Sequence, residues 1–262
     1  MCLFKKKPPI PVIIAPAKRR IITHGRNLYG GQDLKGCWND SVNLSAKAVS
    51  MFSDFDVRKF RDYDATGDRY LAEASGGIQV LSPGATVLVM ADSCFSETLT
   101  RGSAQMNIKH PTKNRFHDPG LPPRRIIHKM VYRNISNHIL MSGCQEHETS
   151  SDAYINGEWA GAFTFFALMS LHLGMTYREW YAEIRKFLPS ADFTQTPTIE
   201  GPDYLLNRKV FEDETLIIHN SSHGSYVYDK NGDEEDGQDE TIYLDRHVVD
   251  YEIGAVLQQI PK

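Results

Sequence analysis

Hydrophobic residues recur along this chain with two different periods. Between residues 40 and 52 apolar side chains return every three or four positions, which predicts a helix with one buried face. Short β-rich runs at 21–23 and 57–60 predict strands, and a second helical pattern extends from 68 to about 74, before a Ser-Pro-Gly turn at 82–84. This part of the chain is therefore expected to alternate between strands and helices.

Two continuous apolar runs each end in a cluster of small polar residues. Residues 85–91 lead into Asp-Ser-Cys at 92–94, and residues 215–218 lead, after two further residues, into Ser-Ser-His-Gly at 221–224. Runs without alternation are typical of strands that are buried on both faces of a parallel sheet. We therefore expect both runs to be central strands.

Another strand is predicted at 138–142, and helices are predicted at 162–173 and 177–188. Residues 101–133 are polar and rich in Lys, Arg, Pro and His, which predicts a surface loop. Strands that alternate with helices predict an α/β fold with a mostly parallel central sheet flanked by helices.

The composition fits a globular protein without a membrane anchor. Four prolines interrupt the short apolar stretch in residues 1–19, which we expect to form a flexible N-terminal arm, and residues 20–262 are expected to form a single domain. No apolar run approaches the roughly 20 residues that span a bilayer, and the four cysteines lack the spacing of a disulfide scaffold or a zinc site. A cytoplasmic protein with free thiols is the expectation.

The net charge of −4 supplies no general attraction to nucleic acid or to anionic membranes, so neither is an expected partner.

Cys94 and His223 both lie just beyond the carboxyl ends of predicted buried strands. In an open parallel sheet these ends border the crevice in which ligands bind, so neighbouring strands would bring the thiol and the imidazole together. A histidine can take the thiol proton, which makes Cys94 a candidate nucleophile and His223 its general base. Gly224 would allow close approach to a substrate and a role in stabilising an oxyanion. The plainer interpretation is a buried core thiol and a surface histidine.

The segments around these two residues resemble those of metacaspases and their bacterial relatives. Residues 221–224 are similar to the family's Ser-Gly-His-Gly, and residues 92–96, Asp-Ser-Cys-Phe-Ser, are similar to its Asp-Ser-Cys-His-Ser. The resemblance covers most of the chain from about residue 20, and it implies the caspase-hemoglobinase fold and hydrolysis of peptide bonds through a thioacyl intermediate. Other similar segments lie at 34–40, 64–66, 161–164 and 236–242.

The resemblance also implies a substrate pocket. In metacaspases the pocket for the residue before the cut is acidic, and the matching positions here are Cys37, Asp40, Asp92 and Ser221. Carboxylates form charge-assisted hydrogen bonds with a guanidinium or ammonium group, so the implied preference is for Arg or Lys. The alternative is that Asp40 caps a helix and Asp92 caps a strand end.

The order of the segments differs from that of the family, in which the His strand usually precedes the Cys strand. Here a caspase-like domain would divide into a Cys-bearing part at 20–100, a loop at 101–133, a small-subunit-like part at 134–213 and a His-bearing block at 214–262. A rearranged chain, self-association with strand exchange between two copies, and an order that differs from the encoded one all explain this arrangement. Insertion of a late strand beside the Cys strand is physically possible, although such non-local pairing is slow.

Many metacaspases need calcium, so the resemblance makes Ca²⁺ the cofactor to consider. Asp239 and Asp250 match plausible ligands, whereas Arg101 stands where another acid is expected. Calcium demands several oxygen ligands, and two carboxylates support only a weak site or none. The acidic stretch at 229–240 begins like a calcium-binding loop, but a solvent-facing loop is the simpler interpretation.

The leading hypothesis is a cysteine endopeptidase that cuts a protein or peptide substrate after a basic residue. A catalytically inactive caspase-like scaffold or regulatory binding protein is the alternative, because Phe95 and Glu97 replace residues that are common in the family. An α/β-hydrolase would need glycines on both sides of the nucleophile, and the segment around Cys94 lacks them. Cys144 also follows a predicted strand and is expected either near the crevice or in the core. Self-cleavage is expected in the loop 101–133, which contains Arg124, Arg125, Lys129 and Arg133.

Overall fold

Six strands form the central sheet of the computed structural model, which describes residues 18–94, 112–121, 137–145, 148–230, 232 and 237–262. Their order across the sheet is β2-β1-β9-β3-β5-β8, and all neighbours are parallel except β8, which runs antiparallel to β5. The strands are β1 (Arg19–Gly25), β2 (Phe55–Arg61), β3 (Thr86–Asp92), β5 (Ile139–Ser142), β8 (Thr198–Glu200) and β9 (Thr215–Ser221).

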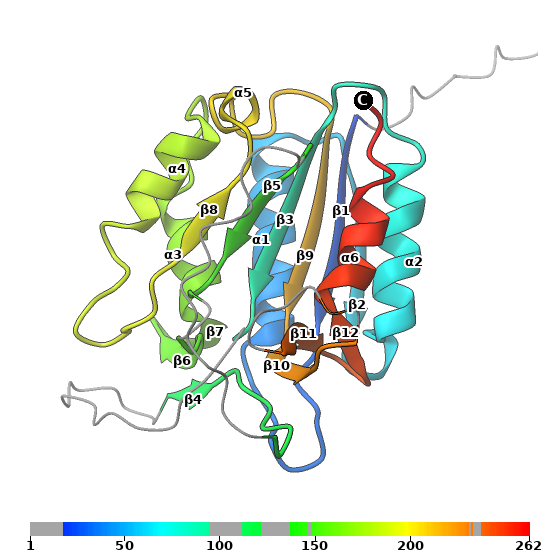
Figure 1. Ribbon diagram of the computed structural model, residues 1–262. Helices are drawn as coiled ribbons and strands as arrows, with labels where there is room; N and C mark the ends of the chain where they lie inside the picture. The colour runs from blue at the N-terminus through cyan, green and yellow to red at the C-terminus, as the bar shows by residue number, and fades with distance from the viewer. Residues whose placement is uncertain (1–17, 95–111, 122–136, 146–147, 231, 233–236) are drawn as a thin grey trace, which may run out of the picture.

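Helices cover both faces of this sheet, so the molecule has three layers (Figure 1). One face packs against α1 (Cys37–Met51), α3 (Ala162–Ser170) and α4 (Tyr177–Ile184), and the other packs against α2 (Gly67–Ile78) and α6 (Asp250–Leu257). Two short helices, η1 (Asp62–Asp64) and α5 (Asp203–Leu206), lie in connections. The α/β class and the mostly parallel sheet that the sequence predicts are confirmed.

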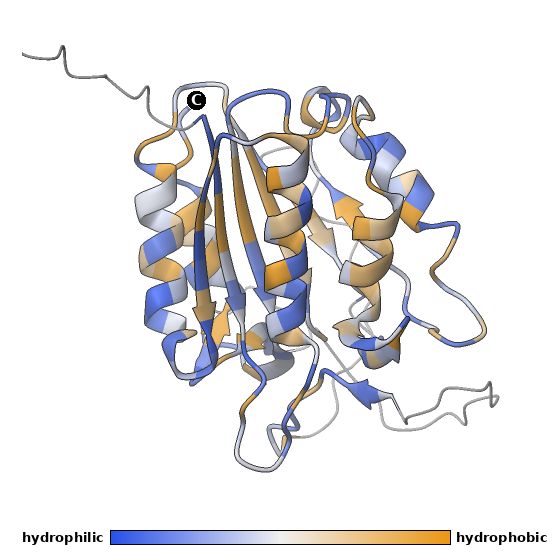
Figure 2. Cartoon of the chain, turned by 180° about the vertical axis from the view of Figure 1, so that it is seen from behind, coloured by the Kyte–Doolittle hydropathy of each residue, from blue (hydrophilic) through white to orange (hydrophobic). Residues whose placement is uncertain are grey.

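Successive residues of the central strands enter different hydrophobic cores because side chains alternate between the faces of a sheet. Ile21 belongs to the core beneath α1, α3 and α4, whereas Ile22 belongs to the core beneath α2 and α6. Figure 2 shows the apolar strands enclosed between the helices. Burial on both faces explains why 85–91 and 215–218 read as continuous apolar runs.

The strand that leads to His223 lies in the middle of the sheet although it comes late in the sequence. β9 pairs with β1 on one side and with β3 on the other. Asp92, the last residue of β3, lies opposite Ser221, the last residue of β9. The His-bearing block therefore inserts beside the Cys-bearing strand of its own chain.

Two small sheets lie at the carboxyl ends of the central strands (Figure 1). One contains β10 (His223–Tyr228), β11 (Gln238–Tyr243) and β12 (His247–Val249), and the other contains β4 (Lys113–Asn114), β6 (Ser151–Ile155) and β7 (Glu158–Gly161). Neither sheet is predicted from the sequence, because their strands are short and mix polar with apolar residues.

Several predicted boundaries are wrong. α3 ends at Ser170 rather than 173, and α4 ends at Ile184 rather than 188, where Pro189 disfavours helical geometry at the residue before it. The start of α4 has a capping box formed by Thr176 and Glu179. The prediction of a surface loop over 101–133 fails at its middle, because β4 pairs with β6 and Arg115 is fully buried. The solvent-facing stretch at 229–240 likewise ends in a strand in which Asp239 is buried.

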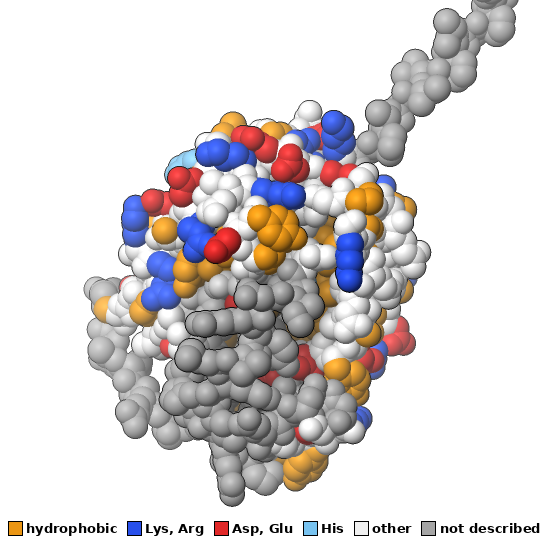
Figure 3. All heavy atoms as spheres, turned by 45° about the horizontal axis from the view of Figure 1, so that its top comes forward, with side chains coloured by type: hydrophobic (Ala, Val, Ile, Leu, Met, Phe, Trp, Pro, Cys, Tyr) orange, Lys and Arg blue, Asp and Glu red, His pale blue; other side chains and the backbone are white. Residues whose placement is uncertain are grey.

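On the face shown in Figure 3, Lys and Arg side chains are interspersed with Asp and Glu. None of the helices in the described ranges is long and apolar enough to cross a bilayer.

Acid is expected to destabilise the fold through His219 of β9. Burial lowers the pKa of this histidine to about 4, and Thr23 Oγ1 lies 2.6 Å from its Nδ1. The unfolded chain binds this proton below about pH 6.5, whereas the folded chain does not bind it until about pH 4, so stability is lost as the pH falls through this window. At pH 5 this effect of His219 lowers the free energy of unfolding by about 2 kcal/mol. Urea unfolding at pH 7 and pH 5 should show a smaller difference for His219→Gln than for the wild type, and equal differences would contradict the assignment.

Candidate active site

Cys94 is a fully buried residue just beyond β3. Its Sγ accepts a hydrogen bond from the amide of Ser150 at 2.9 Å and lies 3.6 Å from the Ser150 carbonyl oxygen. Burial raises the pKa of the Cys94 thiol well above its ordinary value, with a further rise from the neighbouring Cys144 thiol. The thiol is therefore protonated at neutral pH in this state of the chain.

His223 begins β10, and a single residue separates it from the end of β9. Its Nε2 lies 2.7 Å from the carbonyl oxygen of Gln32, which can only accept, so Nε2 carries the proton. Among the described residues, the other ring nitrogen, Nδ1, finds no hydrogen-bond partner, so it keeps its lone pair. This is the tautomer that a general base requires.

The His223 imidazole is neutral in this state. Its pKa is lowered to about 4, chiefly by burial, while the carbonyl groups of Gln32 and Arg115 act in the opposite direction. The amides of Cys94 and of Gly224, the residue after His223, both donate to the Arg115 carbonyl, and the Cys94 thiol is hydrogen-bonded to Ser150. Thiol and imidazole are thus both neutral, and the hydrogen bonds of the thiol run to Ser150.

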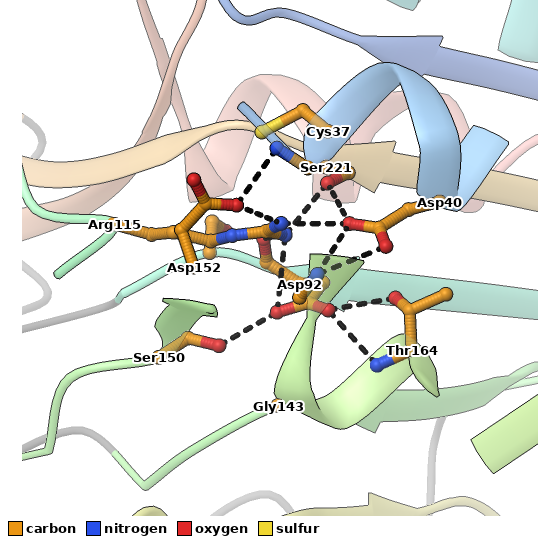
Figure 4. A network of polar contacts seen from close by, with 12 residues as sticks. Cys37, Asp40, Asp92, Arg115, Gly143, Ser150, Asp152, Thr164 and Ser221 are labelled. Carbon is orange, nitrogen blue, oxygen red and sulfur yellow. Dashed lines mark hydrogen bonds and ion pairs between the residues drawn. The ribbon is translucent and has the colours of Figure 1, made fainter. Parts of the chain in front are cut away.

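The guanidinium of Arg115 fills a pocket formed by the residues that the sequence proposes for substrate binding (Figure 4). Its Nη2 lies 2.7 Å from Asp40 Oδ2 and 3.0 Å from Asp152 Oδ1, and its Nη1 lies 3.3 Å from Asp92 Oδ1. Nη1 also donates to Ser221 Oγ at 2.6 Å. Three carboxylates therefore surround one buried cation.

The carboxylates of this pocket are held by other groups. Asp92 accepts from Ser150 Oγ at 2.6 Å and from the amide and hydroxyl of Thr164 at 2.9 and 2.7 Å. Asp40 accepts from the Gly161 amide at 3.0 Å, and burial raises the Asp40 pKa to about 6 against the opposing charge of Arg115. Asp40 does not cap α1, which begins after Gly36 without a side-chain cap, whereas Asp92 accepts from the amide of Thr164 in the first turn of α3.

Glycine at position 161 leaves room for the pocket. A Cβ there would fall on the Asp92 carboxylate and the Arg115 guanidinium. We expect Gly161→Ala to lower the free energy of unfolding by about 1–3 kcal/mol because it displaces these groups.

The control for that change is Gly76→Ala on α2, where a Cβ meets nothing within 4 Å. Alanine favours a helix over glycine by up to about 1 kcal/mol, so this variant should unfold at higher urea concentration. A Gly161→Ala protein as stable as the control would contradict the packing described for the pocket.

The main-chain carbonyl of Arg115 points at two backbone amides. The Gly224 amide donates to it at 2.8 Å, and the Cys94 amide donates at 3.3 Å. A Cβ on Gly224 would fall on the Cys94 carbonyl, so only glycine lets these two segments approach so closely. Two convergent amides beside a thiol form the arrangement that stabilises an oxyanion.

The structure thus brings together all of the residues proposed for catalysis and substrate binding. Cys37, at the start of α1, is also buried there; burial raises its thiol pKa, and the charge of Arg115 opposes that rise. Two members of the site are missed by the sequence analysis, namely Arg115 and Asp152. Asp152 gives little signal, because it follows the polar residues 147–151.

The two proposed calcium ligands lie in different elements. Asp239 is buried in β11 and Asp250 begins α6. Within the described ranges, no three His, Cys, Asp or Glu side chains are close enough to hold an ion. Calcium takes about six to eight oxygen ligands, so the described residues do not fit the ion.

Cys144 is buried, and its Sγ lies 3.4 Å from the Glu148 carbonyl oxygen and 3.6 Å from that of Ser93. The Cys144 thiol is a neighbour of the Cys94 thiol. Phe95, Glu97 and the four basic residues at 124, 125, 129 and 133 lie outside the described residues.

Comparisons with known proteins support the fold alone. No family model matches the chain, and no curated protein matches it. Among solved structures, protein GSU0716 from Geobacter sulfurreducens is similar with a TM-score of 0.52 and 19% sequence identity, over 74% of this chain and 99% of that one.

Proposed function

We propose that the protein is a cysteine endopeptidase with the caspase-hemoglobinase fold that hydrolyses peptide bonds after Arg or Lys. The observation that carries this proposal is the position of Arg115. Its side chain is held by three carboxylates, while its carbonyl oxygen accepts from the Cys94 and Gly224 amides. A basic residue of a substrate would take the same two positions at once, which fixes the scissile bond beside the thiol.

The roles of the catalytic residues follow from their atoms. The Cys94 thiol turns from Ser150 about its χ1 torsion, loses its proton to His223 Nδ1, and adds to the substrate carbonyl carbon. The two amides stabilise the negative charge on the oxygen. His223 then protonates the leaving nitrogen as the C–N bond breaks, and a water molecule hydrolyses the thioester to a carboxylate and the free thiol.

The pocket accounts for the choice of substrate. Asp40, Asp92 and Asp152 are buried, so a cation without its hydration shell gains strongly from them. A guanidinium can bond two of the carboxylates at once, as Arg115 does, whereas an ammonium is a single point charge. Asp or Glu before the cut would bring a like charge into the same space and should be rejected.

A fluorogenic series tests this function. Acetyl-Lys-Asn-X-aminomethylcoumarin with X as Arg, Lys or Asp should be hydrolysed fastest with Arg, and the Asp peptide should be at least about 100-fold slower, since a buried charge pair is worth several kcal/mol. The assay should use protein that has been incubated until its gel pattern is constant, and the Arg115→Gln chain beside it. Failure of both proteins to hydrolyse the Arg peptide would contradict the proposal.

One observation favours the alternative of an inactive scaffold. The Cys94 thiol is bonded to the Ser150 amide instead of to His223. With Arg115 replaced by Gln, a scaffold would bind the Arg peptide in the vacated pocket without hydrolysing it. Binding by isothermal titration, together with an absence of product after prolonged incubation, would therefore favour the scaffold over the enzyme.

A further inference from the structure

A segment of the chain itself crosses the proposed cleft. Lys113 and Asn114 form β4 and pair antiparallel with Asp152 and Ser151 of β6. The amide of Arg115 continues this pairing by donating to the Ser150 carbonyl at 2.9 Å. An extended peptide that adds a strand to an exposed edge is a common way of binding peptides, because its main-chain hydrogen bonds need no particular sequence.

The same segment continues beyond the pocket on the other side of the thiol. The amide of His117 donates to the Gly224 carbonyl at 2.8 Å, and Ser225 Oγ donates to the His117 carbonyl at 2.7 Å. The His117 ring stacks on Tyr243 with centroids 3.8 Å apart, and Phe116 stacks on Tyr226 at 6.0 Å. Side-chain contacts therefore hold the residues on both sides of the Arg115–Phe116 bond.

The occupied pocket is closed to any other side chain. Arg115 is 0% exposed, and its guanidinium uses the carboxylates that an external Arg or Lys would need. Exchange of one cation for another requires that the segment first leave β6 and the pocket.

We propose that residues 113–117 are an internal substrate, so that the intact chain is closed to other substrates until the Arg115–Phe116 bond is cut or the segment is withdrawn. This inference rests on the proposed function for the cutting step alone. The neutral thiol and imidazole of the buried site fit such a resting state, because withdrawal of the segment would expose both to water.

The cutting step balances as ordinary hydrolysis. The Cys94 sulfur bonds to the Arg115 carbonyl carbon, the bond to the Phe116 nitrogen breaks, and that nitrogen takes the thiol proton through His223. Water then splits the thioester and leaves a carboxylate on Arg115 and a free thiol. The products are residues 1–115 and residues 116–262, the second with a new amino terminus at Phe116.

Occupancy of the cleft can be tested without catalysis. In the Cys94→Ala chain, trypsin should cut the Arg115–Phe116 bond at least about 100-fold more slowly than it cuts a synthetic peptide of residues 111–119, because cutting requires the segment to open first. Mass spectrometry of the fragments follows this one bond. Cutting at the rate of the peptide would overturn the proposal, even if the protein proves to be a peptidase.

The cut itself is tested on the full chain with Cys94 present. The purified wild type should yield a fragment that begins at Phe116, and its hydrolysis of the Arg peptide should rise as this fragment forms. Arg115→Gln should not be cut there and should hydrolyse the peptide without that lag. Arg115→Lys should still be cut. Because it keeps the buried charge, it serves as the test if the glutamine variant fails to fold. Cutting at residues 124, 125, 129 or 133 with an intact Arg115–Phe116 bond and full activity would overturn the proposal.

The two tests separate this inference from the proposed function. Trypsin resistance at Arg115 without any hydrolysis of external peptide would support the internal occupant and contradict the peptidase. Rapid hydrolysis by an uncut wild-type chain would support the peptidase and overturn the closed state.

Discussion

Replacing Cys94 with alanine is expected to abolish peptide hydrolysis and self-cleavage together. Loss of a covalent nucleophile from an acyl-transfer site costs on the order of 10⁶-fold in rate, because the acyl intermediate can no longer form. Hydrolysis of the fluorogenic Arg peptide and the fragment pattern on a gel measure the two activities. The folded structure should persist, since alanine removes one buried sulfur and the hydrogen bond that it accepts from Ser150.

Cys2→Ala is the matched control for that change, because it also removes a thiol but lies in the stretch that the sequence predicts to be an arm. It should retain wild-type rates in both assays. Hydrolysis by the Cys94→Ala protein at more than a few per cent of the control would exclude Cys94 as the nucleophile.

The second large effect is expected at Asp92. This carboxylate pairs with Arg115 and accepts three further hydrogen bonds, all in the interior. Asp92→Asn places an amide donor among groups that donate and leaves the cation less compensated, so the free energy of unfolding should fall by about 3 kcal/mol. Urea unfolding at pH 7 measures it. The exposed ion pair between Arg178 and Asp203 supplies the control, and Asp203→Asn should change stability very little.

A double-mutant cycle distinguishes charge pairing from packing at Asp92. In the Arg115→Gln background, Asp40, Asp92 and Asp152 would face one another without a cation, so removal of one charge relieves repulsion. In that background Asp92→Asn should therefore lower the free energy of unfolding by less than about 1 kcal/mol, or raise it. An equal cost in both backgrounds would mean that the Thr164 and Ser150 contacts, rather than Arg115, determine the effect.

The sequence was sufficient to predict the sheet class and the main strand ends of the site. Asp92 and Ser221 each follow a continuous apolar run, and burial on both faces of a central strand produces that pattern. The resemblance of the flanking segments then predicts the pairing of Cys94 with His223, and the register of β3 and β9 places the strand ends before them side by side.

Arg115 was unpredictable for a physical reason. It lies in a stretch rich in Lys, Arg and Pro, and such a composition normally belongs to solvent. Only the three carboxylates make its burial possible, and they come from α1, β3 and β6, which are far apart in sequence. The orientation of the Cys94 side chain could not be predicted either, because it depends on a hydrogen bond from the Ser150 amide in a distant loop.

The central position of β9 has a consequence for the making of the protein. During synthesis β3 is complete at residue 92, but the strand that pairs between it and β1 begins only at residue 215. At about 5–20 residues per second, the ribosome needs on the order of 10 seconds to make the intervening chain. Throughout that time the nascent polypeptide holds its cysteine without its histidine, so under the proposed function it lacks peptidase activity, while the unpaired edges of β1 and β3 expose it to aggregation.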